Sequence, residues 1–216
     1  MGLFLWMSGI PSIDLDATRD AVSSFAQKDG HPLEQTETAD IEGLQYVLTR
    51  SSAGNVLVRL PSESVEYSTL CEHLSNTLDR PILGVHIHDG DFWVYELFVG
   101  EEVVDRFNPL PDYWGEVSEA ERQRWRGNAE TLCKHWPGLD PSSIGKYLTP
   151  WTAKPTGKAY PEDRFEYGMD WQVVDFLRKL QLDYPDTQAP SQSTLRLQPA
   201  ERKLETRRKR WFRFWN

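Results

Sequence analysis

The chain has 216 residues, a net charge of −9 from 24 Lys and Arg against 33 Asp and Glu, and a hydrophobic fraction of 39%. This length suits one large domain or two small ones, and 9 Trp, 9 Phe and 8 Tyr supply much of the area that a core needs. The charge is unevenly placed, because residues 1–195 carry 16 basic and 31 acidic side chains. That excess of negative charge argues against nucleic-acid binding by this part of the chain.

The two cysteines, Cys71 and Cys133, are not arranged as a CxxC pair. Two such residues do not make a disulfide framework, so we expect a reducing, cytoplasmic compartment. No apolar run approaches the roughly 20 residues that a membrane-spanning helix needs. We also expect no cofactor, because the chain has no complete phosphate-binding or nucleophile motif.

Residues 3–50 and 56–107 show the same order of predicted elements. Each stretch begins with a short apolar run, continues through a Pro/Ser turn into apolar residues at helical spacing, and ends in strand-like segments. In the second stretch, Asp89-Gly90 separates two such segments, which is a strong hairpin signal. We interpret the stretches as a pseudo-repeat of βαββ-like units, the second with an extra strand. The predicted fold class is α+β, with an antiparallel sheet and both helices on one face.

Residues 116–182 predict a helical region. Ser118 and Glu121 have the spacing of a capping box ahead of a helix that extends to about Trp136, and Asp170 is placed to cap a later helix. We therefore expect a single domain over residues 1–184. Residues 185–200 are rich in Pro, Gln, Ser and Thr, which is typical of a flexible linker. Residues 201–216 form a basic, aromatic tail.

His86 and His88 are the most suggestive candidates for chemistry. On a strand their side chains point to the same face, so together with Asp91 they could ligate a metal ion. The alternative is a half-exposed hairpin with the histidines facing outward. A metal site needs further ligands, and the other histidines offer no recognisable spacing. We favour the hairpin and keep the metal site as a second hypothesis.

Large aromatic residues are dense between residues 113 and 171. They either line a groove for a peptide or small ligand or fill the core in place of aliphatic side chains, and we favour the core. These residues are Tyr113, Trp114, Trp125, Trp136, Tyr147, Trp151, Tyr160, Tyr167 and Trp171.

The tail is the candidate binding segment. From Arg196 onward the chain has 8 basic and 2 acidic residues, and on a helix Trp211, Phe212 and Trp215 share one stripe, as in helices that lie at a membrane interface. Single-stranded nucleic acid, a partner protein and the protein's own acidic surface are alternative ligands, and a solvated tail without a ligand is a further alternative. The candidate contact residues are Arg207, Arg208, Lys209, Arg210, Trp211, Phe212, Arg213 and Trp215.

Three functional hypotheses follow from the sequence. The first, which we favour, is a non-enzymatic binding or adaptor protein whose tail contacts an anionic or protein partner, such as an anionic membrane surface. The second is a metal-dependent hydrolase that uses His86, His88 and Asp91. The third is an immunity-type partner protein whose acidic surface masks a basic partner.

Overall fold

The computed structural model describes residues 2–28, 30–38, 43–62, 67–184 and 193–200. Within them, eight strands form one antiparallel sheet in the order β2-β8-β3-β4-β1-β5-β6-β7. This sheet, together with its helices, confirms the predicted α+β class. The strands are β1 (Leu5–Ile10), β2 (Leu33–Thr36), β3 (Tyr46–Arg50), β4 (Val56–Arg59), β5 (Ile82–His88), β6 (Phe92–Val99), β7 (Glu102–Phe107) and β8 (Ser193–Pro199).

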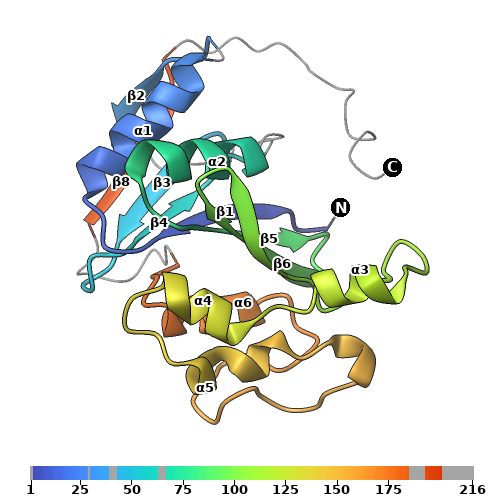
Figure 1. Cartoon of the computed structure of the whole chain (residues 1–216). Coiled ribbons are helices and arrows are strands. Elements are labelled where there is room, and N and C mark those ends of the chain that lie inside the picture. The colour runs from blue at the N-terminus through green and yellow to red at the C-terminus, as the bar shows by residue number, and fades with distance from the viewer. Residues whose placement is uncertain (1, 29, 39–42, 63–66, 185–192, 201–216) are drawn as a thin grey trace.

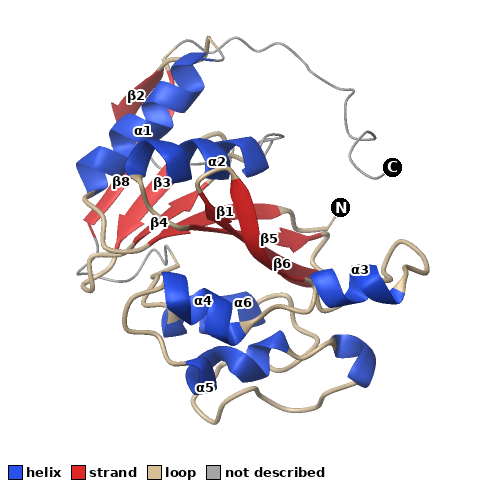
Figure 2. Cartoon of the chain, in the orientation of Figure 1, coloured by secondary structure: helices blue, strands red, loops and turns tan. Residues whose placement is uncertain are grey.

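Helices lie on both faces of the sheet (Figure 1; Figure 2). The two helices of the predicted units, α1 and α2, contact each other on one face, as expected. The helical region that follows the sheet covers the opposite face with α4, α5 and α6, so the architecture has three layers. The helices are α1 (Leu15–Lys28), α2 (Tyr67–Leu78), α3 (Glu119–Arg124), α4 (Ala129–His135), α5 (Pro141–Ile144) and α6 (Gln172–Lys179). Two 3-10 helices, η1 (Gly145–Leu148) and η2 (Trp151–Ala153), follow α5.

The alternation of side chains along β1 shows how one strand serves two cores. Ile10 is fully buried in the core beneath α1 and α2, whereas Met7 is fully buried in the core that contains residues of α4 and α6. Gly9 faces the second core, and a Cβ at this position would lie 2.4 Å from Cδ1 of Leu182. Successive residues of a strand point to opposite faces, so the central strands are apolar on both sides.

The two predicted units share an order of elements but not an arrangement of strands. The first contributes β1, α1, β2 and β3, and the second contributes β4, α2, β5, β6 and β7. In the first unit the strand next to the helix in sequence, β2, lies at the edge of the sheet. In the second unit the corresponding strand, β5, pairs with β1 near the centre. The first strands of the two units, β1 and β4, pair with each other.

The prediction of a flexible linker over residues 185–200 is wrong for its second half. Residues 193–199 form β8, which lies inside the sheet between β2 and β3. Leu195 and Leu197 are 8% and 2% exposed and alternate with Thr194, Arg196 and Gln198, so a strand signal of period two was present beneath the polar composition. Residues 185–192 and the tail, 201–216, lie outside the described residues.

The helix expected from Ser118 to about Trp136 is divided into α3 and α4. The oxygen of Ser118 accepts a hydrogen bond from the Glu121 amide at 3.2 Å, which confirms the predicted cap. The helix ends at Arg124 with Trp125 as its C-cap. Gly127 then adopts a φ of +71° in the connection, and Asn128 caps α4 through the Thr131 amide. The cap predicted at Asp170 is wrong, because Trp171 occupies the N-cap of α6 and has no side-chain cap bond.

Candidate functional site

An aromatic surface lies where β5 turns into β6. Its centre is the ring of His88, which packs against four aromatic rings with centroid separations between 4.8 and 5.8 Å. The rings come from the N-terminal segment, from β6 and from the loop after β7. We define the aromatic surface as Leu3, Phe4, His88, Phe92, Tyr113 and Trp114.

Three large residues of the aromatic surface are exposed. Tyr113 is 41%, Trp114 is 47% and Leu3 is 37% exposed. Phe92, beneath them, is fully buried and lies 4.9 Å from the ring of Tyr113 and 5.7 Å from that of Trp114. The exposed rings therefore rest on a fixed base of core side chains, which is the arrangement found in protein contact sites.

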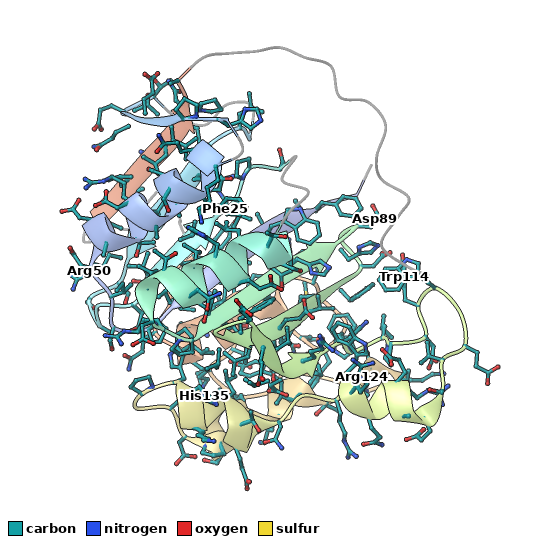
Figure 3. All side chains as sticks on the ribbon, turned by 45° about the horizontal axis from the view of Figure 1, so that its top comes forward. Phe25, Arg50, Asp89, Trp114, Arg124 and His135 are labelled. Atoms are coloured by element: carbon teal, nitrogen blue, oxygen red, sulfur yellow. The ribbon has the colours of Figure 1, made fainter. Side chains whose placement is uncertain are left out.

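Aspartates stand around the aromatic surface. Asp89 and Asp91, both exposed, belong to the turn between β5 and β6, and Asp91 accepts a hydrogen bond from the Tyr113 hydroxyl. Burial raises the pKa of Asp170, and the charge of Asp91 raises it further. Figure 3 shows Asp89 and Trp114 at the same end of the molecule. This surface combines exposed aromatic rings with negative charge.

Local structure holds the loop that carries Tyr113 and Trp114. The Tyr113 amide donates to the Leu110 carbonyl at 3.0 Å, and the Gly115 amide donates to the Asp112 carbonyl at the same distance. The Asp112 carboxylate accepts hydrogen bonds from the Val117 amide and from the Arg122 guanidinium. Both bonds, that from Arg122 above all, lower the pKa of Asp112. Because the loop is tied down, little ordering is required when a ligand binds to it.

A second cluster, Trp6, Tyr67 and His86, lies beside the aromatic surface on the α2 side of the sheet. The ring of His86 is 4.4 Å from that of Trp6, 5.9 Å from that of Tyr67 and 6.2 Å from that of His88. Among the described residues, Nε1 of Trp6, Oη of Tyr67 and Nδ1 of His86 are buried without a hydrogen-bond partner. Burial lowers the pKa of His86 to about 3, with a smaller contribution from His88. The imidazole is therefore neutral at physiological pH.

The structure places the predicted metal ligands as follows. His86 and His88 lie on one face of β5, as their spacing predicts, and they are packed among aromatic rings. Asp91 lies beyond the turn, and its carboxylate is engaged by Tyr113. In the part of the chain that the structure describes, no group of three or more His, Cys, Asp or Glu side chains is arranged to hold a metal ion. The described residues thus give the hydrolase hypothesis two imidazoles without a third ligand.

Cys71 lies close to this region but is not set up as a nucleophile. Its thiol is fully buried and is 3.3 Å from the hydroxyl of Ser8. Burial raises the pKa of Cys71 to about 12, so the thiolate that nucleophilic catalysis requires is not formed at neutral pH. The second cysteine, Cys133, is half-buried, and burial raises its pKa as well.

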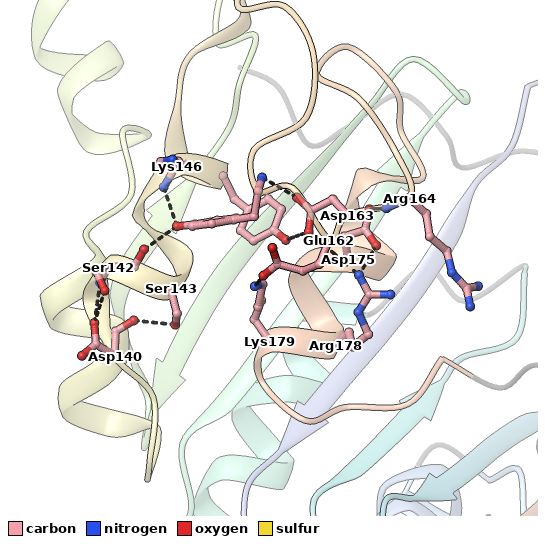
Figure 4. A network of polar contacts seen from close by, with 12 residues as sticks. Asp140, Ser142, Ser143, Lys146, Glu162, Asp163, Arg164, Asp175, Arg178 and Lys179 are labelled. Carbon is pink, nitrogen blue, oxygen red and sulfur yellow. Dashed lines mark hydrogen bonds and ion pairs between the residues drawn. The ribbon is translucent and has the colours of Figure 1, made fainter.

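A polar network in the helical region contains the most deeply buried carboxylates (Figure 4). Asp175 accepts from the amides of Arg164 and Phe165, both at 2.8 Å, and from Arg178 at 2.7 Å. Asp163 accepts from the Tyr147 hydroxyl at 2.6 Å and from the Tyr160 amide at 2.9 Å. Every oxygen of the two carboxylates is thus occupied by a neighbour on the same chain, so the network fixes the loop before α6 and is structural.

The predicted aromatic-rich region divides into core and surface. Trp136, Tyr147 and Trp151 are buried, in agreement with the core interpretation, whereas Tyr113 and Trp114 are exposed. The remaining four, Trp125, Tyr160, Tyr167 and Trp171, are half-buried. Sequence reasoning did not single out Tyr113 and Trp114, because their exposure depends on His88 and Phe92 being beneath them.

The predicted tail residues, Arg207 to Trp215, lie outside the described residues. Among the residues that are described, no helix has the length and apolar character needed to cross a membrane. In comparisons with known proteins, no family model, no curated protein and no solved structure matches the chain. The class of the protein is therefore defined by its fold, an α+β sandwich with a mixed aromatic and acidic surface at one end of its sheet.

Proposed function

We propose that this chain is a non-enzymatic, protein-binding adaptor whose contact site is the aromatic surface. The observation that carries the proposal is the exposure of Tyr113 and Trp114, at 41% and 47%, on a base of buried rings. Tyrosine and tryptophan are the residues most enriched at the energetic centres of protein interfaces. Exposed apolar patches on a protein mark interaction sites, so a solvent-facing pair of Tyr and Trp on a fixed loop supports a binding role for this surface.

The ligand that suits this surface carries basic and aromatic side chains. Asp89 and Asp91 supply negative charge beside the rings, and residues 1–195 carry a net charge of −15 that attracts cations from a distance. An arginine can stack on the face of Trp114 while it pairs with a neighbouring carboxylate. The same surface disfavours phosphate, so nucleic acid is not the proposed ligand of the body.

The tail is a second part of this proposal. Its basic and aromatic residues, 207 to 215, suit a contact with an anionic surface or with a partner protein. In an adaptor of this kind, the aromatic surface and the tail present opposite charges and recognise different ligands.

The test uses calorimetric titration of the full chain with a short synthetic peptide of alternating Arg and Trp residues. A matched peptide with Glu in place of Arg serves as the charge control. We expect the basic peptide to bind, the acidic peptide not to bind, and Trp114→Ala to weaken binding at least about tenfold. Leu44→Ala, which truncates an apolar side chain of 36% exposure outside the surface, leaves the affinity within about twofold. Equal affinity in wild type and Trp114→Ala would refute the proposed contact site.

A further inference from the structure

The aromatic surface and the tail have complementary chemistry within one chain. Residues 201–216 contain seven basic and two acidic residues, together with Trp211, Phe212, Phe214 and Trp215. The aromatic surface offers exposed rings between aspartates. The tail thus carries cations and aromatic rings, and the aromatic surface carries carboxylates and aromatic rings. Cation–π interactions and charge complementarity both favour contact between two such sets of side chains.

The register of the sheet places the start of the tail at the same end of the sheet as the aromatic surface. Arg196 of β8 pairs with Val47, and Val47 and Met7 both pair with Arg59 of β4. Met7 in turn pairs with Val85 of β5. Because every pair in this row is antiparallel, the direction from Arg196 to Ala200 is also the direction from Met7 to Leu3 and from Val85 to His88.

The tail is long enough to reach the aromatic surface from the end of β8. Ala200 is fixed by its amide, which donates to the Pro32 carbonyl at 2.9 Å. Three strands, β3, β4 and β1, separate β8 from β5, which corresponds to about 19 Å across a flat sheet and more across a twisted one. An extended chain spans about 3.3–3.6 Å per residue, so residues 201–210 cover up to about 35 Å before the first tryptophan of the tail.

From these observations we propose that residues 201–216 bind to the aromatic surface of their own chain and thereby cover the site that the adaptor uses for its partner. The inference rests on the proposed function of that surface. A partner segment of the same chemistry then competes with the tail. Release of the tail makes its cations available for the second contact.

The strength of such docking follows from tethering. A tail on a short connection experiences an effective concentration on the order of 1 mM. If the isolated contact has a dissociation constant of about 100 µM, the tail is docked about ten times more often than it is free. Docking therefore protects the tail about tenfold, which is measurable.

The experiment measures trypsin cleavage of the tail in the full chain by intact-mass spectrometry. The seven basic residues of the tail are the cleavage sites: Arg202, Lys203, Arg207, Arg208, Lys209, Arg210 and Arg213. We expect Trp114→Ala to accelerate loss of the tail about tenfold, independently of protein concentration. The control variant Leu44→Ala, which truncates a partly exposed apolar side chain outside the aromatic surface, is expected to be cleaved at the wild-type rate. A second variant, Asp89→Asn with Asp91→Asn, accelerates cleavage without truncating a packed ring.

Three outcomes would overturn the inference. The first is equal cleavage rates in wild type, Trp114→Ala and the double aspartate variant. The second is protection that rises with protein concentration, which would place the tail on a second copy. The third is tail loss that slows only when vesicles of phosphatidylserine and phosphatidylcholine are added, which would make a membrane the ligand of the tail. None of these outcomes bears on binding of the unrelated basic peptide, so failure of the inference and failure of the proposed function are distinguishable.

Discussion

Tyr67, at the start of α2, lies directly over Gly84 in the middle of β5. A Cβ at position 84 would be 2.6 Å from the Tyr67 hydroxyl oxygen and 2.9 Å from the sulfur of Cys71. The backbone at position 84 is in an extended strand and has no unusual φ, so conformation alone does not require glycine there. Glycine is needed because a side chain at this position would prevent the close approach of α2 to the sheet.

Substitution Gly84→Ala is expected to destabilise the protein by about 1–3 kcal/mol, the usual cost of overpacking a core. Urea denaturation monitored by tryptophan fluorescence measures the effect. Tyr67→Phe serves as the control: it removes a buried hydroxyl that has no partner among the described residues, so it leaves stability unchanged or slightly raised. The double variant recovers part of the loss, because the closest atom is removed. A fully stable Gly84→Ala variant would contradict this packing.

Stability should fall on acidification because of His86. Its pKa is lowered to about 3 in the folded protein, against about 6.5 in an unfolded chain. Between these values the unfolded state binds more protons, so this group's contribution to stability is present above pH 6.5 and is lost as the pH falls. Replacement by Phe removes the dependence. Between pH 7.5 and 5.5, wild type should lose about 1.4 kcal/mol more than His86→Phe. An equal loss of unfolding free energy in wild type and His86→Phe between these two pH values, measured by urea denaturation, would contradict this prediction.

The polar network predicts unequal effects for two acidic residues. Asp175→Asn disturbs a fully buried carboxylate that accepts from two amides and Arg178, so we expect a loss of about 3–5 kcal/mol. Glu162 pairs with Lys179 at the surface and has a side chain that is 57% exposed, so Glu162→Gln should cost far less stability than Asp175→Asn. Thermal and urea unfolding of both variants compare these costs, and similar losses would contradict the structural role assigned to Asp175.

The two cysteines should differ in reactivity. Cys71 is fully buried and its pKa is raised to about 12, whereas Cys133 is half-buried. Iodoacetamide should therefore label Cys133 at least about tenfold faster than Cys71 in the native protein. In urea the two cysteines should be labelled at similar rates. Peptide mass spectrometry after timed quenching gives the two rates. Rapid native labelling of Cys71 would mean that α2 opens readily from the sheet.

Much of the fold was predictable because its signals are local. The Asp89-Gly90 turn, with φ values of +52° and +74°, and the Ser118 cap both depend on neighbours in sequence. The strand at Leu195 and Leu197 was missed because a short alternation is a weaker signal than the surrounding polar composition. The division of the helix at Gly127 was missed because one glycine is tolerated in many helices.

The candidate site was less predictable, because it depends on tertiary contacts. His86 and His88 were found as a pair on one face, but the sequence does not show that Trp6 and Trp114 pack against them. Tyr113 and Trp114 have the same local sequence signals as the aromatics that proved to be core. Only the position of their loop over Phe92 makes them a surface.

The position of β8 has a consequence for the order of folding. Strands β2 and β3 are near neighbours in sequence, yet β8 separates them and pairs with both. Strands β2 and β3 cannot be joined in the sheet until residues 193–199, which lie far along the chain, pair between them. Such non-local pairing slows folding and leaves an unpaired edge on β3 in the meantime. We therefore expect a late kinetic intermediate in which β3, β4, β1, β5, β6 and β7 are formed, and in which the free edge of β3 can pair with another molecule.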